Sequence, residues 1–259
     1  MISNTSIFMM AFTAIISIAL PIVLIVIMRV KYKASLKSFF IGAAAFFVAV
    51  QCIEGQINYY LLVGNSNTSS LIMGNTIIYM LYGGLMAGIF EETARYICFR
   101  FILKDERRIQ DGISYGIGHG GIEAILFVGV TYVINIAVSL MINAGVPVEG
   151  AMEGAYNQLS MIPSYNFGLA GIERICAIII QIGLSIIVFN AVKYGKKSYY
   201  FIAILIHAFI DFPVALVQRG ALNVVVMEIM LLIISAGFIL FIIKEIKKNK
   251  NDLLSWINI

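Results

Sequence analysis

Runs of twenty or more mostly apolar residues recur along this chain of 259 residues, and no other feature constrains the fold as strongly. An α-helix needs about 20 apolar residues to cross the hydrocarbon core of a bilayer. Here 61% of the residues are hydrophobic and only 12% are charged. A membrane β-barrel would show sustained alternation of apolar and polar residues, which this sequence lacks. The sequence therefore predicts an all-α, polytopic transmembrane helical bundle.

We expect about seven spans in a single integral membrane domain covering residues 1–259, because no internal repeat or second soluble domain is visible. The first apolar run is long and follows MISNTSIFMM, which lacks the basic residues of a secretory signal, so we expect it to be retained. The predicted spans are 7–28, 38–63, 71–100, 112–142, 167–191, 200–218 and 221–243.

Basic residues are concentrated in alternate connecting segments. RVKYKASLK, RFILKDERR, KYGKK and KEIKKNK hold fifteen of the eighteen Lys and Arg residues, whereas GNSNTSS and NAGVPVEGAMEGAYNQLSMIPSYN hold none. Cytoplasmic loops carry the excess of Lys and Arg, so we predict an outside N-terminus and a cytoplasmic C-terminus. The basic residues flank spans and form no stripe, which predicts membrane lipids as partners and no nucleic acid. The final NDLLSWINI is interpreted either as a surface-lying segment or as a solvated tail.

Ionisable residues inside three predicted spans are separated by four positions. The pairs are Glu91 and Arg95, His119 and Glu123, and His207 and Asp211. Residues at i and i+4 share a helix face, and charged groups in membrane helices usually face the bundle interior. At a rise of 1.5 Å per residue these groups lie roughly 10–18 Å from the basic ends of their spans. We therefore expect one convergent polar cavity on the cytoplasmic side of the midplane.

Imidazole and carboxylate groups around one cavity permit two kinds of peptide hydrolysis. In the first, a glutamate is the general base for water, and histidines with an amide or carboxyl group stabilise the oxyanion. In the second, two histidines and carboxylates hold a zinc ion with an open position for water. The zincin motif HExxH is absent, and the two histidines, His119 and His207, come from different spans. Any metal site would therefore be assembled across the bundle.

Three motifs in a fixed order carry a resemblance to a known family. EETAR, YGIGH and HAFID resemble the motifs of the CAAX-prenyl-endopeptidase and bacteriocin-processing (CPBP) membrane proteases. FEETARY and GHGGIE are more similar to the YhfC-type membrane peptidases, a branch of the same superfamily. The resemblance covers roughly residues 80–215. It implies an intramembrane endopeptidase that cleaves a membrane-associated peptide or protein substrate, which we expect to reach the site from the cytoplasmic side.

The predicted site combines this resemblance with the positions of the polar residues. The expected catalytic residues are Glu91, Glu92, His119, His207 and Asp211, with Arg95 and Glu123 in support. If a metal is used, we expect zinc, held by His119, His207, Glu123 and Asp211. The chain has EExxR where the family has EExxxR, which leaves open whether Glu91 or Glu92 is the base.

Two other function classes stay open, and further residues carry predictions of their own. The intramembrane acids and histidines also suit a proton- or cation-coupled transporter, and a non-catalytic immunity or chaperone protein could keep the same fold. We expect Glu173 and Arg174 to form an ion pair near the outer membrane interface; if their helix starts earlier or is re-entrant, Glu173 would instead reach the cavity. Asn135, Gln181 and Asn190 are expected to bond between helices. The three cysteines are expected to be buried as small apolar residues. Residue usage favours a bacterial plasma membrane.

Overall fold

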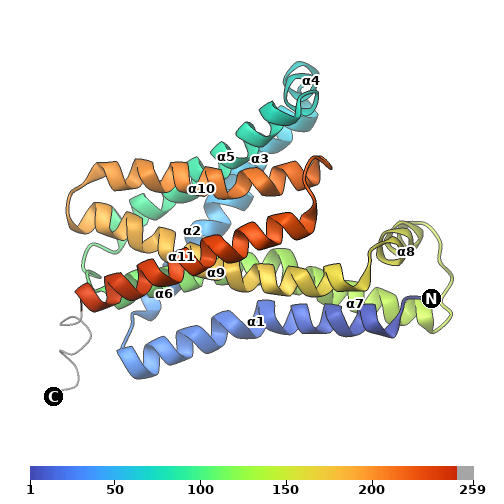
Figure 1. Ribbon diagram of the computed structural model, residues 1–259, viewed down its shortest axis with the longest axis horizontal. Helices are drawn as coiled ribbons and strands as arrows, with labels where there is room; N and C mark the ends of the chain where they lie inside the picture. Colours follow the sequence, from blue (N-terminus) through green and yellow to red (C-terminus); the bar gives the residue numbers. More distant parts are fainter. Residues whose placement is uncertain (250–259) are drawn as a thin grey trace.

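The fold is a bundle of long helices, which confirms the predicted all-α class. The computed structural model describes residues 1–249, so the predictions for NDLLSWINI fall outside the described residues. Within that range, every regular element is a helix (Figure 1). Six helices are long and apolar enough to cross a membrane, and a seventh span results if two helices joined by a sharp bend are counted together.

Several long helices contain π-helical turns, labelled η, without interruption of the helix. The first helices are α1 (Asn4–Tyr32), a continuous run of α2 (Leu36–Phe46), η1 (Phe47–Glu54), α3 (Gly55–Tyr59) and η2 (Tyr60–Gly64), and then α4 (Ser66–Met73). They are followed by α5 (Thr76–Ile97) with η3 (Cys98–Ile102), and by α6 (Ile109–Glu123), η4 (Ala124–Gly129) and α7 (Val130–Asn143). The last are α8 (Ala151–Met161), α9 (Ser164–Lys193), α10 (Lys197–Gln218) and α11 (Val224–Lys248).

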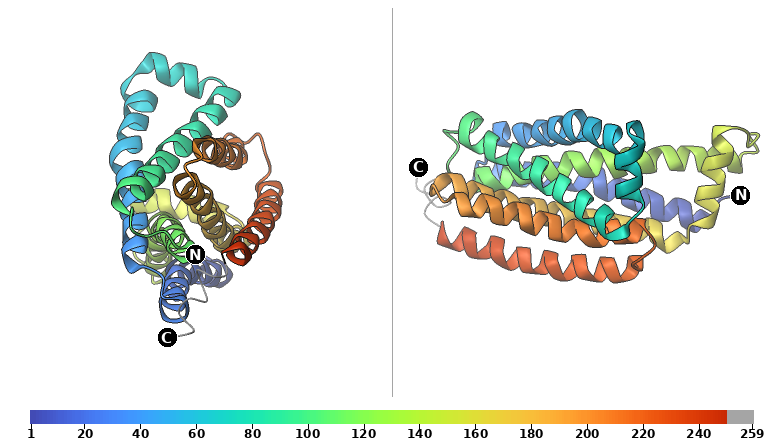
Figure 2. Two further views of the ribbon diagram at one scale, coloured as in Figure 1. Left: turned by 90° about the vertical axis from the view of Figure 1, so that its left-hand side faces the viewer. Right: turned by 90° about the horizontal axis from the view of Figure 1, so that it is seen from above.

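The ends of six long helices agree with the predicted spans to within five residues, but the start of the third span was wrong. The predicted span 71–100 breaks between α4 and α5, which are bent by 106°. Asn75 caps α5, because its side-chain oxygen accepts from the backbone N–H groups of Ile77 and Ile78. The short helices α4 and α8 run across the bundle axis (Figure 2, right).

α9 is the central helix of the bundle. It contacts α1, α5, α6, α10 and α11, and the long helices lie side by side in the end-on view (Figure 2, left). One apolar core joins α9 to α5, α10 and α11 through residues such as Leu184, Val188 and Phe99. A second core joins it to α1 and α6 through residues such as Ile117 and Ile186. Every element with a predicted site residue therefore packs against α9.

Glycines bring α6 close to the helix formed by residues 36–64. A Cβ atom on Gly118 would lie 1.9 Å from the carbonyl oxygen of Phe39, and one on Gly42 would lie 2.3 Å from that of Tyr115. Only a residue without a side chain allows this approach. The contact places His119, the next residue after Gly118, at the centre of the bundle.

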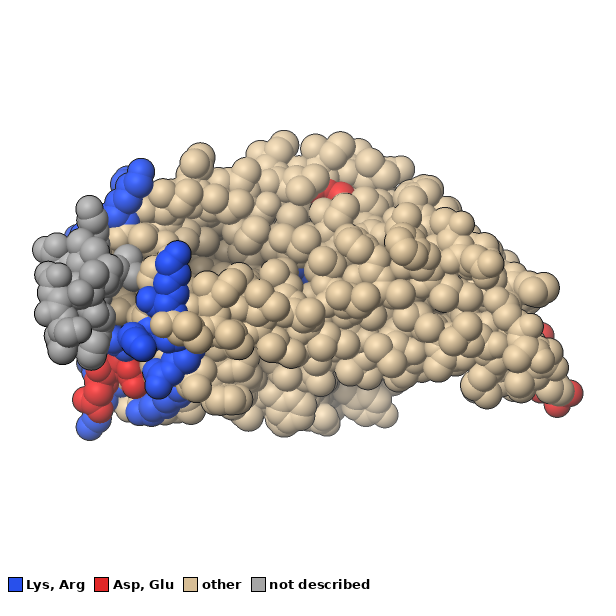
Figure 3. All heavy atoms as spheres, turned by 90° about the horizontal axis from the view of Figure 1, so that it is seen from below, with Lys and Arg blue, Asp and Glu red and all other residues tan. Residues whose placement is uncertain are grey.

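Charged side chains are concentrated at the two ends of the molecule. On the face in Figure 3, lysines and arginines gather at one end, and the wide belt between the ends is almost free of charge. The basic end holds the connections between α1 and α2, η3 and α6, and α9 and α10. We call it the basic end, and the end that carries α8 the opposite end. The predicted membrane orientation follows from this asymmetry and stays a prediction.

Candidate active site

Glu91 of α5 meets His119 of α6 in the interior of the bundle. Its Oε2 accepts a hydrogen bond from Nε2 of His119 over 2.7 Å and another from Nε2 of Gln181 over 3.1 Å. His119 is fully buried, and its ring packs edge-on against Phe46. An ionised carboxylate can only accept, so the imidazole proton is assigned to Nε2. Within residues 1–249, Oε1 of Glu91 receives no hydrogen bond, which leaves it open to a water molecule.

Glu92 is held by groups of the protein on both of its oxygens. Nη1 of Arg95 donates to both oxygens, over 2.6 and 2.8 Å, and Nδ1 of His207 donates to Oε1 over 2.7 Å. Neither Glu92 nor Arg95 has any exposed surface. This arrangement turns the other ring nitrogen of His207, Nε2, toward Oε2 of Glu91 at 3.8 Å and Oδ2 of Asp211 at 3.6 Å. Glu92 thus orients His207, whereas Glu91 stays available.

Gln181 of α9 joins the two glutamates to the rest of the polar interior. Its Oε1 accepts from Nη2 of Arg95 over 2.5 Å. Its Nε2 donates to Glu91 and to Oε2 of Glu123, each over 3.1 Å. The side-chain amide is therefore fixed in one orientation. The expectation that Gln181 bonds between helices is confirmed, as is that for Asn190, which donates to Glu245 of α11 over 2.9 Å. The same expectation was wrong for Asn135, because within residues 1–249 only its backbone oxygen takes part in a side-chain hydrogen bond.

A second ionic cluster lies across the cavity from His207. Arg174 of α9 donates to Oε1 of Glu123 over 2.9 Å and also to Glu173. The predicted pair of Glu173 and Arg174 forms. Because α9 begins at Ser164, ahead of the predicted start at 167, both residues line the cavity, as expected of Glu173 for an earlier helix start. Arg174, which is only partly exposed, thereby supplies a positive charge beside two carboxylates.

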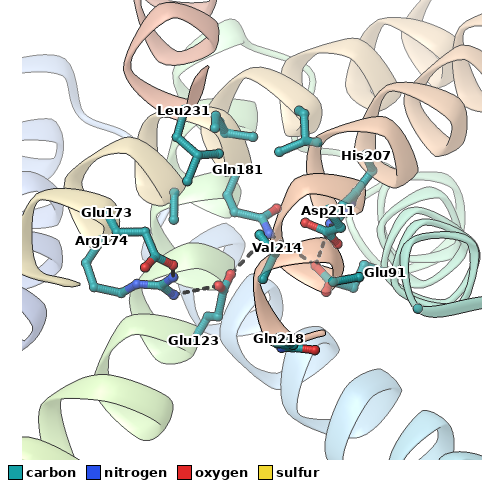
Figure 4. A pocket seen from close by; sticks show the side chains of 15 residues that line it. Glu91, Glu123, Glu173, Arg174, Gln181, His207, Asp211, Val214, Gln218 and Leu231 are labelled. Carbon is teal, nitrogen blue, oxygen red and sulfur yellow. Dashed lines mark hydrogen bonds and ion pairs between the residues drawn. The ribbon is translucent and has the colours of Figure 1, made fainter. Parts of the chain in front are cut away.

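Both clusters line one cavity of about 280 Å³ (Figure 4). Glu91, His207 and Asp211 lie on one side, Glu123, Glu173 and Arg174 lie on the other, and Gln181 lies between them. One water molecule takes up about 30 Å³, so water and part of a peptide chain have room here. Residues of α5, α6 and α10 thus converge as predicted, and His119 reaches the cavity through its bond to Glu91. Gln181 and Arg174 of α9 also line the cavity, which was not predicted.

Of the three i, i+4 pairs that were predicted to share a helix face, two have members that bind other partners. Arg95 binds Glu92 instead of Glu91, and Glu123 binds Arg174 instead of supporting His119. Positions four apart on a helix are offset by about 40°, which is enough for two side chains to face different neighbouring helices. Only the pair of His207 and Asp211 forms within 4 Å.

Sequence reasoning missed two buried acids near the site. Glu54 of η1 is 7% exposed, accepts from Nδ2 of Asn58 over 3.1 Å, and lies close enough to Glu91 and His207 for electrostatic interaction. Glu228 of α11 is 4% exposed and lies near Arg174. The signal that could have found them is a carboxylate inside an apolar span, since Glu54 falls in the predicted span 38–63 and Glu228 in 221–243.

The predicted metal ligands do not fit a shared ion as they are arranged. No group of three or more His, Cys, Asp or Glu side chains in the described part of the chain is placed to hold a metal. Nε2 of His119 bonds to Glu91, and the oxygens of Glu123 accept from Arg174 and Gln181. The predicted set was His119, His207, Glu123 and Asp211.

Comparison with known proteins gives two matches. The model of the family described as YhfC intramembrane metalloprotease matches residues 16–231. A protein of Bacillus subtilis (strain 168) described as "Uncharacterized membrane protein YhfC" is 41% identical over 253 residues, which cover 94% of this chain and 98% of its own length. No solved structure matches. The match to a bacterial membrane protein and the apolar helices show an integral membrane protein and agree with a bacterial plasma membrane.

Proposed function

The chain belongs to the YhfC intramembrane metalloprotease family, and we propose that it is an intramembrane endopeptidase in which Glu91 activates water. The observation that carries the proposal is the position of this carboxylate. Glu91 lines the cavity, receives two hydrogen bonds on Oε2, and leaves Oε1 open. A general base needs this combination of a fixed side chain and a free acceptor atom.

In the proposed reaction Oε1 of Glu91 takes a proton from water, and the resulting hydroxide attacks the carbonyl carbon of the scissile peptide bond. His119 and Gln181 hold the carboxylate in place through Oε2. As the C–N bond breaks, the protonated Glu91 returns the proton to the leaving amine. The buried site excludes most water, and electrostatic stabilisation is stronger in such a site than in solvent.

His207 is the proposed oxyanion donor. Its Nδ1–H is bound to Glu92, so a proton on Nε2 makes the ring an imidazolium that faces the cavity between Glu91 and Asp211. Arg95 balances the charge of Glu92 from the other side. The chain Arg95–Glu92–His207 therefore positions one hydrogen-bond donor for the charge that develops on the carbonyl oxygen.

The test is peptide cleavage by purified protein in detergent, measured with a quenched peptide library. Glu91→Gln keeps the shape of the side chain but removes the base, so we expect roughly a 10²- to 10⁴-fold loss of cleavage rate. Glu153→Gln, an exposed position on α8, is the matched control and should cleave at the wild-type rate. Cleavage by Glu91→Gln at the rate of this control would reject the proposal.

Metal dependence is tested in the same preparation. The donor arrangement supports a glutamate mechanism, so we expect cleavage to survive a strong chelator and the purified protein to contain less than one zinc ion per chain. Loss of cleavage on chelation, with recovery on adding zinc, would show instead that the family name describes this chain's chemistry. The same outcome would require His119 or His207 to leave its carboxylate partner.

A flux assay distinguishes the transporter hypothesis from the peptidase hypothesis. Proteoliposomes under a pH gradient would show proton flux that falls in Glu91→Gln if the polar interior conducts protons. The proposed peptidase instead requires cleavage without such flux. A protein that does neither, although it is folded, would match the non-catalytic hypothesis.

A further inference from the structure

The cavity extends toward one end of the bundle, as the positions of its lining residues along each helix show. On α10 they run from His207 to Gln218, and on α5 they include Glu91 and Gly83. On α9 they run from Gln181 back to Glu173. Each series leads away from the basic end. The end of α10 at Gln218, the start of α5 at Thr76 and the start of α9 at Ser164 are the ends of these helices that lie away from the basic connections. The seven positions from Asp211 to Gln218 correspond to about 10 Å along the helix.

Toward the basic end, the cavity is closed by packed side chains. Glu92 and Arg95 have no exposed surface, and neither do Phe99, Leu103 and Tyr115, which lie closer to the basic end. Between α9 and α11, the ring of Phe238 lies so close that a Cβ atom on Gly183 would be 2.0 Å from its Cδ1. No comparable closure surrounds Gly83, because a Cβ atom there would meet nothing within 4 Å.

Polar contacts lie at the end of the cavity that Gln218 lines. Gln218 accepts a hydrogen bond from the hydroxyl of Tyr79 over 2.8 Å, and both residues are on the surface. Arg219 donates to the carbonyl oxygen of Met73 over 2.8 Å and so connects the end of α10 to the end of α4. The bend between α4 and α5 therefore lies beside this opening.

We propose that substrate and water reach Glu91 and His207 from the opposite end of the bundle, and not from the basic end. With the predicted orientation, this is the extracytoplasmic side. The inference deepens the proposed function: the substrates are membrane proteins or peptides whose scissile segment enters the bundle from the outer side and extends along the cavity to Glu91 and His207. It replaces the expectation, drawn from the sequence, of access from the cytoplasmic side.

The test is thiol labelling, which needs no peptidase activity. Single cysteines at Val214→Cys and Gln218→Cys are placed in a chain whose native Cys52, Cys98 and Cys176 are changed to Ala, and each is treated with a membrane-impermeant thiol reagent. Ser160→Cys on α8 and Lys196→Cys at the basic end report which side of right-side-out or inverted vesicles the reagent meets. Leu205→Cys, on the exposed face of α10, is the control for a position outside the cavity.

We expect Val214→Cys and Gln218→Cys to be labelled in the vesicle orientation that also labels Ser160→Cys. Neither should be labelled in the orientation that labels Lys196→Cys. Leu205→Cys should stay unlabelled in both. Labelling of Val214→Cys together with Lys196→Cys, or from neither side in protein that elutes as a folded species, would overturn the inference. A chain that shows the expected labelling but no cleavage would reject the proposed function and leave the access route standing.

Discussion

The adjacent residues Glu91 and Glu92 have different surroundings, and this difference assigns their roles. Glu91 lines the cavity and keeps one oxygen free, whereas Glu92 is fully buried between Arg95 and His207. Adjacent positions on a helix point about 100° apart, so one acid faces α6 and α9 and the other faces α10. The motif alone left the base undecided, and the environment of each side chain favours Glu91.

Glu92→Gln is expected to act mainly on stability. It leaves the guanidinium of Arg95 buried without its counter-charge, a change that typically costs about 3–5 kcal/mol. Thermal unfolding in detergent should show a large decrease in the melting temperature for Glu92→Gln and a much smaller one for Glu153→Gln. Equal melting temperatures for these two variants would show that the Arg95–Glu92 pair does not support the fold.

At the scale of elements, the sequence predicted the long helices well and their irregularities poorly. The apolar runs and basic flanks located six helices, because length and hydropathy are set by the bilayer. The break between α4 and α5 and the π-helical segments were missed. π-Helical turns adjoin Glu54 and Glu123 at the site. Such turns are common near functional sites but have no periodicity that a hydropathy pattern can reveal.

The close contact between α6 and the helix at residues 36–64 is expected to be the helix contact most sensitive to substitution. Gly118→Ala would place a Cβ atom against the carbonyl oxygen of Phe39 and displace the neighbouring His119. Overpacking typically costs about 1–3 kcal/mol, so both melting temperature and cleavage rate should fall.

Gly237→Ala is the matched control, because its Cβ atom would meet nothing within 4 Å. It should be neutral or slightly stabilising, since alanine is the better helix former. Equal effects of Gly118→Ala and Gly237→Ala would contradict the close approach of α6 to the helix at residues 36–64.

At the scale of the whole molecule, the sequence predicted how far along the bundle the polar side chains lie. It did not predict which neighbouring helix each side chain faces. The matching depths of Glu91, His207 and Asp211 in their spans were the basis for predicting that these residues converge. The facing of other residues was missed because lipid-exposed and buried positions of a membrane helix are both apolar. Cys52 is therefore exposed, contrary to expectation, whereas Cys98 and Cys176 are buried. For the same reason the position of Arg174 in the cavity emerged only from the packing of α9.

The central claim is that Glu91 and His207 act together in one catalytic site. Residues that act as a unit show strongly non-additive effects when they are removed singly and together. The most direct measurement is therefore the cleavage rate of Glu91→Gln, His207→Gln and the double variant, each compared with the Glu153→Gln control. We predict that the double variant is about as slow as the slower single variant. Losses that multiply, or a single variant with full activity, would contradict the claim.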